Sequence, residues 1–378
     1  MTLTLEAIKQ LAIEKALELG AGSVRISSAQ SDPETHDRMR ASFARGDLAS
    51  WGYGDGYAEC ASNPQSLLDT ARAVVSVAVA YASEPLPRGR LDGRVSNYAW
   101  SPDYHHRMRE MLAQIADVID AAAGESVCAV ACDTAPLAER AYAAKAGLGW
   151  VGKHTNLISP ELGSFVFLGE IATSLPLPSD DPIRKQCGSC TRCVDACPTR
   201  ALRGDYTIDA SRCISDLTQR TDAIPRSMRA LIGEWVWGCD ICQDVCPPTK
   251  RAGYGTDLCY SPLSKSLGAP SLQTLLRLRS GEFKRTYRRS ALGWRGSAVL
   301  RRNAAVALGN ALDRSCVGVL MEALTEDSHP MVRGHAAWAL GRIASPAALG
   351  ALRGRRAHEA DPTVLEEIDA ALEPFESR

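Results

Sequence analysis

The sequence lacks long apolar runs, an export signal and any marked excess of charge of one sign. No run approaches the roughly 18 apolar residues that a membrane helix needs, so we expect no membrane contact. The start, MTLTLEAIKQLAIEKALELG, carries Glu6 and Glu14 among its apolar positions, which indicates an amphipathic helix and not an export signal. Without export, the thirteen cysteines do not indicate a disulfide framework, and we expect a cytoplasmic protein. A formal net charge of −1 means that any basic surface is local.

The first third of the chain alternates helical patterns with short β-branched runs. The strand candidates are residues 24–26, 73–82, 126–132 and 165–172, and residues 103–123 are the clearest helix candidate. This alternation predicts a domain of α/β layers over residues 1–175. Asp133 follows the third strand candidate directly, at the kind of strand end beyond which open α/β sheets bind ligands.

Two further regions follow, each with its own composition. A Pro- and Asp-rich join, LPLPSDDPIRKQ, leads into a cysteine-rich block, which we predict as a domain over residues 176–258. Residues 259–378 are rich in Ala and Leu, and there LRRNAAVALGN, VRGHAAWALGR and VLEEIDAALE repeat at an offset of 32 residues. This register aligns Leu308, Leu340 and Leu372. Such a period is typical of stacked helix pairs of the HEAT type, which bury their apolar faces against neighbouring repeats.

Eight cysteines of the middle block have the spacing of ligands for two [4Fe–4S] clusters. The run CGSCTRCVDACP follows C-x2-C-x2-C-x3-C-P, whose fourth cysteine ligates the other cluster in two-cluster ferredoxins. The run CDICQDVCP supplies three more cysteines, and Cys213 between the runs supplies the eighth. We therefore assign Cys187, Cys190, Cys193 and Cys246 to one cluster, and Cys197, Cys213, Cys239 and Cys242 to the other.

A structural zinc site is the alternative, because C-x2-C pairs also build zinc ribbons. No histidine lies between Cys187 and Cys246, and two C-x3-C-P endings fit two cubes better than sites of four ligands. A buried free cysteine usually acts as a small hydrophobic residue, so no role is assigned to Cys60, Cys128, Cys132, Cys259 and Cys316.

Several longer motifs stand out: SNYAWSPDYHHRMR, CDTAPLAERAYAAKAGLGWVGKHTNLI, GSFVFLGEI and the two cysteine runs with their flanks. Together they resemble the epoxyqueuosine reductase family, and the resemblance extends from about Gly52 to the C-terminus. It implies an α/β cobalamin-binding catalytic domain, a ferredoxin-like domain with two [4Fe–4S] clusters, and an all-α HEAT-like repeat domain that binds tRNA. It also implies an enzyme that reduces the epoxide of epoxyqueuosine, at the wobble position of tRNA, to queuosine.

The resemblance implies roles for individual residues as well. Asp133 matches the family's catalytic aspartate and is the candidate general acid, a role that requires a raised pKa near neutral pH. In the alternative, Asp133 is a helix N-cap, and Glu139 and Arg140 form a surface pair. No complete D-x-H-x-x-G element begins at Asp103, which is consistent with base-off cobalamin that has no protein nitrogen ligand. The residues implied to contact the corrin are Asn97, Asp133, Glu139, His154, Leu157 and Asp240, although His154 could equally be a satisfied polar group of its turn.

Two places depart from the family pattern. Ser101 stands where the family usually has glycine. After Cys213, the chain has Asp216, Gln219 and Arg220 in place of an aromatic residue and an isoleucine–glutamate pair. These departures leave the cluster ligands intact and bear on which base is recognised.

A basic stretch opens the repeat region. Residues 277–302 contain nine Arg and Lys residues against one acid, Glu282, with Tyr287 and Trp294 interleaved. This pattern suits phosphate contacts and base stacking in tRNA, and a solvated helix face is the alternative. Helical spacing would put Arg285 and Arg289 on one face with Arg288 beside them. The predicted tRNA-binding residues are Arg285, Arg288, Arg289, Arg301 and Arg302.

Two other functions would use the same features. A related corrinoid and iron–sulfur reductase could act on a different substrate, although a small organohalide would need neither the basic stretch nor the repeats. An electron-transfer module could dock on a protein partner, although it would not need the D-x-A-P motif. The expected partners are tRNA and an external electron donor, and the family resemblance implies a monomer.

Overall fold

The structure is a computed structural model that describes residues 3–49, 51–255 and 264–376 and forms two compact units. The first unit combines Met1–Glu84, Asp103–Ser211 and Asp240–Ser261, and the second combines Pro85–Pro102, Arg212–Cys239 and Pro262–Arg378. Each unit is thus assembled from segments that lie far apart in the sequence. The three-part division at residues 175/176 and 258/259 stays a prediction, and its second boundary lies, with Cys259, outside the described residues.

A four-stranded sheet in the order β1-β2-β7-β4 forms the centre of the first unit. All four strand predictions are confirmed, as β1 (Ser23–Ser28), β2 (Ala73–Ala80), β4 (Cys128–Ala131) and β7 (Val166–Thr173). Every neighbouring pair is antiparallel, so the carboxyl ends of β2 and β4 share an edge with the amino ends of β1 and β7. The strand-end rule for open parallel sheets, which singled out Asp133, therefore does not apply to this sheet, although Asp133 does follow β4.

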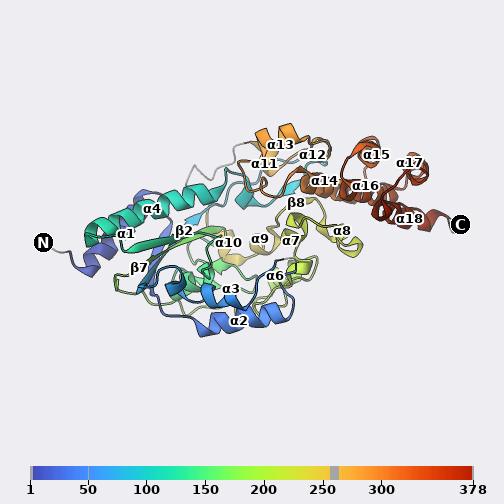
Figure 1. Ribbon diagram of the computed structural model, residues 1–378. Helices are drawn as coiled ribbons and strands as arrows, with labels where there is room; N and C mark the ends of the chain where they lie inside the picture. Colours follow the sequence, from blue (N-terminus) through green and yellow to red (C-terminus); the bar gives the residue numbers. More distant parts are fainter. Residues whose placement is uncertain (1–2, 50, 256–263, 377–378) are drawn as a thin grey trace. The chain divides into compact units, whose positions relative to one another are not determined.

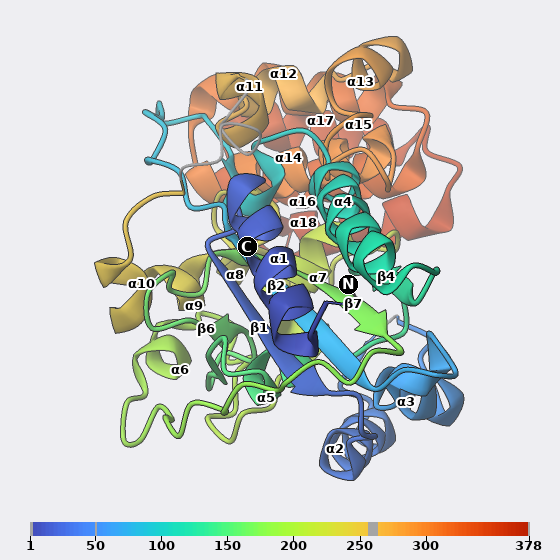
Figure 2. The same cartoon turned by 90° about the vertical axis from the view of Figure 1, so that its left-hand side faces the viewer.

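Helices cover both faces of the sheet. α1 (Leu5–Glu18) and α4 (Tyr104–Ala123), both confirmed as predicted helices, pack against each other over one face (Figure 2). Gly169 of β7 lets α4 approach closely, because a Cβ atom there would lie 2.7 Å from Leu112 Cδ1. Successive strand residues point to opposite faces, so Leu168 and Glu170 face the other side. On that side Leu168 packs with Ala143 of α5 (Glu139–Lys145).

The other elements of the first unit are short. α2 (Pro33–Ala44) packs against α3 (Asp55–Ala61), and β5 (Trp150–Val151) pairs with β6 (Leu157–Ile158). The helices of the cysteine runs are α6 (Arg192–Ala196), α9 (Ile241–Asp244) and α10 (Pro247–Arg251). α6 packs against α9, so the fold brings the two cysteine runs together.

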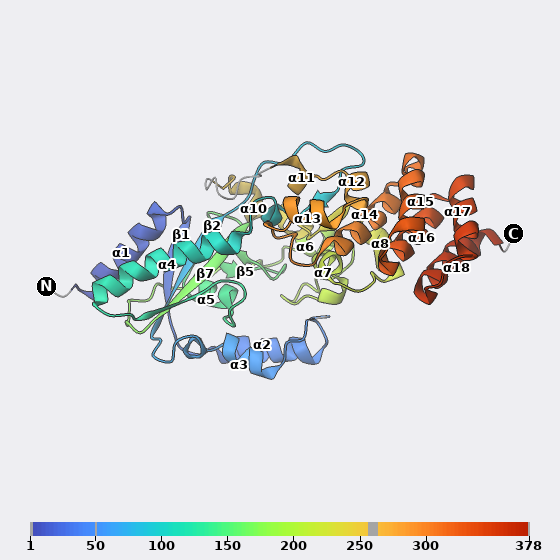
Figure 3. The same ribbon diagram turned by 45° about the horizontal axis from the view of Figure 1, so that its top comes forward.

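Paired helices form most of the second unit, seen in orange and red in Figures 1 and 3. Alternate helices are neighbours, because α14 packs on α16, α16 on α18, and α15 on α17. Leu308, Leu340 and Leu372 are fully buried, which confirms the repeat register. Gly309 of α14 permits close packing, since a Cβ atom there would lie 2.8 Å from Ala339 Cβ of α16. The helices are α14 (Ser297–Ala311), α15 (Val317–Glu326), α16 (Pro330–Ile343), α17 (Pro346–Arg356) and α18 (Pro362–Glu376).

Shorter elements complete the second unit. β8 (Trp235–Trp237) pairs in parallel with β3 (Arg94–Val95) and packs on α14, and apolar residues of these elements and of the repeats form one continuous core. The short helices are α7 (Ile214–Gln219), α8 (Arg226–Ile232), α11 (Lys265–Gly268), α12 (Leu272–Leu276) and α13 (Ser280–Thr286). Across both units, no described helix combines the length and the apolar character needed to cross a membrane.

Candidate active site

Asp133 lies at the start of a loop that connects β4 to α5. Its φ of +53° is in the left-handed region, which aspartate tolerates better than most residues. Its backbone N–H donates a hydrogen bond to Glu139 Oε1, so the first residue of α5 closes the loop. The N-cap of α5 is Ala138, and the alternative that Asp133 caps this helix is therefore wrong. The Asp133 side chain is half-exposed and free to meet a ligand.

His105, in the first turn of α4, connects two aspartates. Its Nε2 lies 3.0 Å from Asp133 Oδ2, and its Nδ1 lies 2.5 Å from Oδ1 of Asp103, the N-cap residue of α4. Burial opposes a charge on His105, but the hydrogen bonds to Asp103 and Asp133 outweigh it and raise the pKa of His105 to about 9. An imidazolium flanked by two carboxylates is therefore the state of this group at neutral pH.

The sequence-based expectation that the pKa of Asp133 is raised is wrong. The hydrogen bond from His105 is the largest influence on Asp133, and it lowers the pKa of this carboxyl despite partial burial. A cationic neighbour favours the carboxylate, and no pattern in the sequence placed His105 beside it. The proton at this site is held on the imidazole at neutral pH, and Asp133 is ionised.

Aromatic rings support the His105 side chain. The Tyr104 ring stacks on the His105 ring at 4.1 Å between centroids and on the Phe167 ring of β7 at 4.0 Å. The Phe167 ring in turn stacks on Tyr81 at 4.2 Å. This column connects the first turn of α4 to the sheet and so fixes the direction of the imidazole.

Two further carboxyl groups lie beneath the Asp133 loop. Burial raises the pKa of Glu139 to about 7 and the pKa of the wholly buried Glu170 well above its usual range. The two groups interact, because the charge of Glu139 contributes to the raised pKa of Glu170. Neither carboxyl oxygen of Glu170 has a hydrogen-bond partner among the described residues, so burial favours the neutral form of Glu170 over the carboxylate.

His154 is buried in the turn between β5 and β6. Its Nδ1 accepts a hydrogen bond of 3.3 Å from the Asn156 backbone, which puts the ring proton on Nε2. Burial lowers the pKa of His154 to about 4, so the ring is neutral. Within the described part of the chain Nε2 has no acceptor, so only one of the two ring nitrogens is satisfied by the protein. A buried donor without a partner fits a polar group of a bound ligand.

The other predicted corrin contacts are buried residues of three separate elements. Leu157 is buried in β6, where it pairs with Val151, and Asp240 is the buried N-cap residue of α9. Asn97 is buried in a short 3-10 helix of the second unit. Within the predicted set, a hydrogen bond joins Asp133 and Glu139 directly.

The four cysteines of the first predicted cluster group all belong to the first unit. Burial is the main cause that raises the pKa of Cys193, and the charges of Cys187 and Cys246 add to it. Burial likewise raises the pKa of Cys246, with smaller contributions from Cys187 and Cys190, so these thiols lie close enough to influence one another. Cys246 and Cys187 also pack beside Trp150 and Ile158. All twelve described cysteines are free of disulfides. The role of the four cysteines of this group as the ligands of one cluster stays a prediction.

Cys197, assigned to the second cluster, is the C-cap residue of α6. Burial opposes its ionisation, but hydrogen bonds from Thr199, Ala201 and Leu202 outweigh it and lower the pKa of the thiol. N–H donors around a sulfur suit a cluster ligand, whose thiolate they stabilise. Cys242 belongs to α9 of the first unit, while Cys213 and Cys239 flank α7 and β8 in the second.

The predicted tRNA-binding arginines divide into two classes. Arg285, Arg288 and Arg289 are exposed, and none forms an ion pair within the described ranges. α13 ends at Thr286, so the expected helical face is wrong: Arg288 and Arg289 lie in the turn that follows. Trp294 is 52% exposed with the Arg295 guanidinium 3.6 Å from its ring, whereas Tyr287 is buried and unable to stack on a base.

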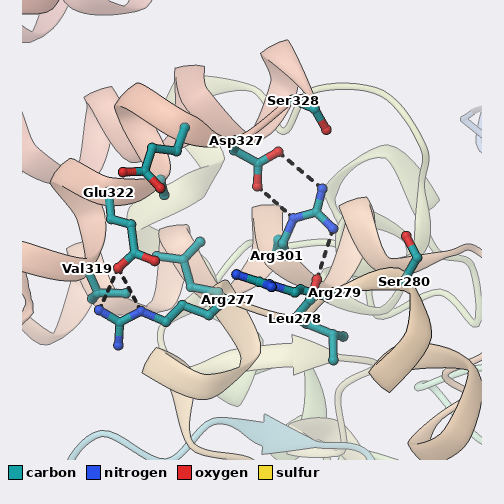
Figure 4. Close-up of a pocket in the computed structure, with 12 residues that line it drawn as sticks. Arg277, Leu278, Arg279, Ser280, Arg301, Val319, Glu322, Asp327 and Ser328 are labelled. Atoms are coloured by element: carbon teal, nitrogen blue, oxygen red, sulfur yellow. Dashed lines mark hydrogen bonds and ion pairs between the residues drawn. The ribbon is translucent and has the colours of Figure 1, made fainter.

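Arg301 and Arg302 are not surface cations. Figure 4 shows Arg301 paired with Asp327, at 2.7 Å from Nε to Oδ2, beside a pocket of about 450 Å³. Across the pocket, Arg277 pairs with Glu322 at 2.6 Å. Arg302 is fully buried and donates to backbone carbonyls, so its predicted contact with tRNA is wrong. Burial lowers the pKa of Arg302 to about 9. The hydrophobic periodicity of the sequence does not distinguish the buried Arg302 from an exposed arginine.

The departures after Cys213 form a local ion pair. Asp216 and Arg220 are both buried, and Arg220 Nε donates to Asp216 Oδ2 at 3.1 Å. Gln219 Oε1 accepts from the Tyr98 hydroxyl at 3.4 Å. Ser101 is buried as well, with its hydroxyl donating to the Pro102 carbonyl at 3.1 Å. These substitutions are accommodated inside the second unit.

Three family models match the chain. They are the 4Fe-4S double cluster binding domain at residues 186–249, epoxyqueuosine reductase QueG, DUF1730, at residues 62–134, and HEAT repeats at residues 289–373. The chain is 34% identical to the epoxyqueuosine reductases of Bacillus anthracis and Bacillus subtilis, over 97% of this chain and 97% and 95% of theirs.

Solved structures are similar over the whole chain. A crystal structure of epoxyqueuosine reductase with a tRNA-Tyr epoxyqueuosine-modified tRNA stem loop has a TM-score of 0.93 at 33% identity, covering 99% of this chain and 100% of that one. The structure of epoxyqueuosine reductase from Streptococcus thermophilus has a TM-score of 0.89 at 31% identity, covering 98% and 99%.

Proposed function

The chain belongs to the epoxyqueuosine reductase family, and we propose that it reduces the epoxide of epoxyqueuosine in tRNA to give queuosine. The observation that carries this proposal is the match over 99% of the chain to an enzyme solved with an epoxyqueuosine-modified tRNA stem loop. The chain is thus an oxidoreductase whose partner is tRNA. Its proposed location is the cytoplasm.

The reaction fixes what the protein must supply. Conversion of the epoxide to the alkene of queuosine consumes two electrons and two protons and releases the oxygen as water. A 4Fe–4S double-cluster domain is present, and such clusters pass electrons one at a time. We propose that Cys187, Cys190, Cys193 and Cys246 hold one cluster and that the other is held by Cys197, Cys213, Cys239 and Cys242. The external electron donor and the monomeric state stay predictions.

We further propose that the first unit binds cobalamin. The partnerless buried Nε2–H of His154 fits a donor to the polar periphery of such a group, and Glu139 and Leu157 offer further contacts. Bound cobalamin would supply reducing power at a carbon of the epoxide. No cofactor-binding histidine motif is present in the sequence, consistent with the base-off form.

The proton for the departing oxygen comes from the Asp133–His105 pair in this proposal. At neutral pH His105 carries the proton and Asp133 the negative charge. When substrate covers the site and excludes water, a neutral pair becomes more favourable than an ion pair, since a low dielectric penalises both charges. The proton then moves from Nε2 to Asp133, which lies 3.0 Å away and donates it to the oxygen. Asp133 can therefore donate a proton although its own pKa is lowered, because His105 supplies that proton.

Phosphate contacts are proposed for Arg285, Arg288 and Arg289, the exposed part of the basic stretch. We propose that Trp294, which is exposed, stacks on an unpaired base. Arg302 is excluded from this surface by its burial, and the Arg301 guanidinium is paired with Asp327.

The test is anaerobic turnover with tRNA that carries epoxyqueuosine, followed by nucleoside analysis of digested tRNA. The expected result is conversion to queuosine by protein reconstituted with iron, sulfide and cobalamin. Protein reconstituted without cobalamin is the control. Unchanged epoxyqueuosine with fully loaded, reduced protein would contradict the proposed function.

A further inference from the structure

We propose that Thr218, held in place by Asn303 and Arg302 of the first repeat helix, positions Cys213 and Cys239 for cluster binding. The inference rests on the cluster assignment under the proposed function. It gives α14 a role in the iron–sulfur chemistry that its repeat pattern does not indicate. All of these residues belong to the second unit.

The Thr218 hydroxyl connects the neighbours of both cysteines. It donates to the carbonyl of Ile214, the residue after Cys213, at 2.9 Å. It accepts from the backbone N–H of Gly238, the residue before Cys239, at 2.9 Å. Thr218 is fully buried, so no water competes for either bond. One hydroxyl thus fixes the distance between two chain segments that carry cluster ligands.

Asn303 of α14 supports the same two segments. Its Nδ2 donates to the Thr218 carbonyl at 2.7 Å and to the Val236 carbonyl at 2.8 Å. The first of these belongs to the segment after Cys213, and the second to the strand before Cys239. The side chain is 1% exposed, which makes loss of either acceptor costly.

Arg302 fixes the amide of Asn303 and the end of α7. Its Nη2 and Nε donate to Asn303 Oδ1 at 2.7 and 3.0 Å, which orients Nδ2 toward its two carbonyl acceptors. Nη2 of Arg302 also donates a hydrogen bond to the Leu217 carbonyl at 3.0 Å. Nη1 donates to the carbonyls of Arg220 and Asp222 at 2.8 and 2.6 Å. These hydrogen bonds of the guanidinium are all with neutral oxygens, several of them at the C-terminal end of α7, where the helix dipole favours a cation.

The arrangement has a chemical consequence for one cluster. Groups that orient metal ligands tune affinity and reduction potential, because they set the angle and hydrogen bonding of each thiolate. The Thr218 network supports two of the four cysteines assigned to one cluster. None of the described bonds of Thr218, Asn303 or Arg302 involves a ligand of the other cluster.

The experiment replaces the hydroxyl with a methyl group in the full-length protein, as Thr218→Val. Thr325→Val is the matched control, since the Thr325 hydroxyl donates to the Met321 carbonyl of its own helix at 2.9 Å and to no other segment. We expect iron from one cluster to pass to a chelator roughly tenfold faster in Thr218→Val, the lower end of the usual effect of such supporting groups. The reduced-state EPR signal of that cluster should change, while the other signal and the Thr325→Val protein match wild type.

Two comparisons keep the result interpretable. Should Thr218→Val fail to fold, Thr218→Ser and Thr218→Ala differ from each other by the hydroxyl alone, and Ser is expected to behave as wild type. Chelation rates and EPR signals equal to wild type in Thr218→Val, or equal between Ser and Ala, overturn the inference. Cys213→Ala tests the underlying assignment separately: full iron content in that variant would show that the ligand assignment, and not only the support by Thr218, is wrong.

Discussion

The Nε2 atom of His105 lies 3.0 Å from Oδ2 of Asp133, and this contact lowers the pKa of Asp133 and contributes, with Asp103, to the raised pKa of His105. His105 gains a pKa of about 9 from its two carboxylate neighbours, while the pKa of Asp133 is lowered. The pair as a whole therefore holds one proton across the neutral range. A catalytic carboxylate with an imidazolium partner needs no raised pKa of its own to have a proton within reach.

Asp133→Asn should abolish most turnover, because the amide has nearly the same shape but no acidic proton. General acid catalysis is worth about 10²–10⁴-fold, so we expect kcat to fall by that factor. Iron content and tRNA affinity should match wild type. Asp117→Asn, at an exposed position of α4, is the control. Turnover within about threefold of wild type would remove Asp133 from the proton transfer.

His105→Gln should change the pH profile as well as the rate. In wild type the pair loses its proton as pH rises through about 9, so kcat should decline there. The variant has no imidazolium to supply a proton, and Asp133 alone is ionised over the whole neutral range. Its rate should therefore fall with rising pH from a lower pH than in wild type. Coincident wild-type and variant profiles of kcat against pH would contradict the proton-holding role.

Glu170→Gln should alter the dependence of stability on pH. The folded-state pKa of Glu170 lies well above the value of an exposed glutamate, so between the two pKa values the folded protein binds more protons than the unfolded chain. Stability must then fall as pH rises through that window, by at most about 1.4 kcal/mol per pH unit for one proton.

Thermal unfolding of wild type and Glu170→Gln from pH 5 to pH 8 measures this effect. The variant should gain stability relative to wild type as pH rises, because glutamine has no proton to lose. Glu161→Gln, at an exposed position, should follow wild type at every pH. A constant difference between wild type and Glu170→Gln across the range would show that Glu170 does not stay protonated.

Anaerobic reconstitution should give about eight iron atoms per chain, four for each of the two cubes. Cys197→Ala should reduce the content by one cluster and leave the cluster of Cys187, Cys190, Cys193 and Cys246 in place. Cys60→Ala, outside the predicted ligands, is the control. An iron content near four in wild type, or stoichiometric zinc, would contradict the assignment.

Replacement of Arg285, Arg288 and Arg289 together with glutamine should weaken tRNA binding. The slope of log K against log salt should become shallower by about one unit for each phosphate group that is no longer bound, since fewer counterions are released. Iron content should stay unchanged. The triple replacement of Arg25, Arg38 and Arg72, exposed residues of the first unit, is the charge-matched control. Equal affinity and salt slope in both triple variants would identify the basic stretch as a solvated surface.

Much of this protein was determined by local sequence. The four strands, the helix of residues 103–123 and the repeat register of Leu308, Leu340 and Leu372 follow from hydrophobic periodicity, because each element must bury one face. The cysteine spacing likewise defines a double-cluster domain, since short turns between thiolates impose a fixed geometry.

Charge and protonation were decided only by the tertiary structure. The contact of His105 with Asp133 joins α4 to the loop after β4, and nothing in either segment alone predicts it. Some of these residues could have been noticed in the sequence. Glu170 is an acid inside the apolar run FVFLGEIA, and Asp103 and His105 are only two residues apart. Arg302 and Arg285 look alike in the sequence, yet one is buried among backbone carbonyls and the other is exposed. Periodicity reports which residues are apolar, whereas the pKa of a carboxyl and the partner of a guanidinium depend on groups brought from distant segments, and these are defined only once the chain has folded.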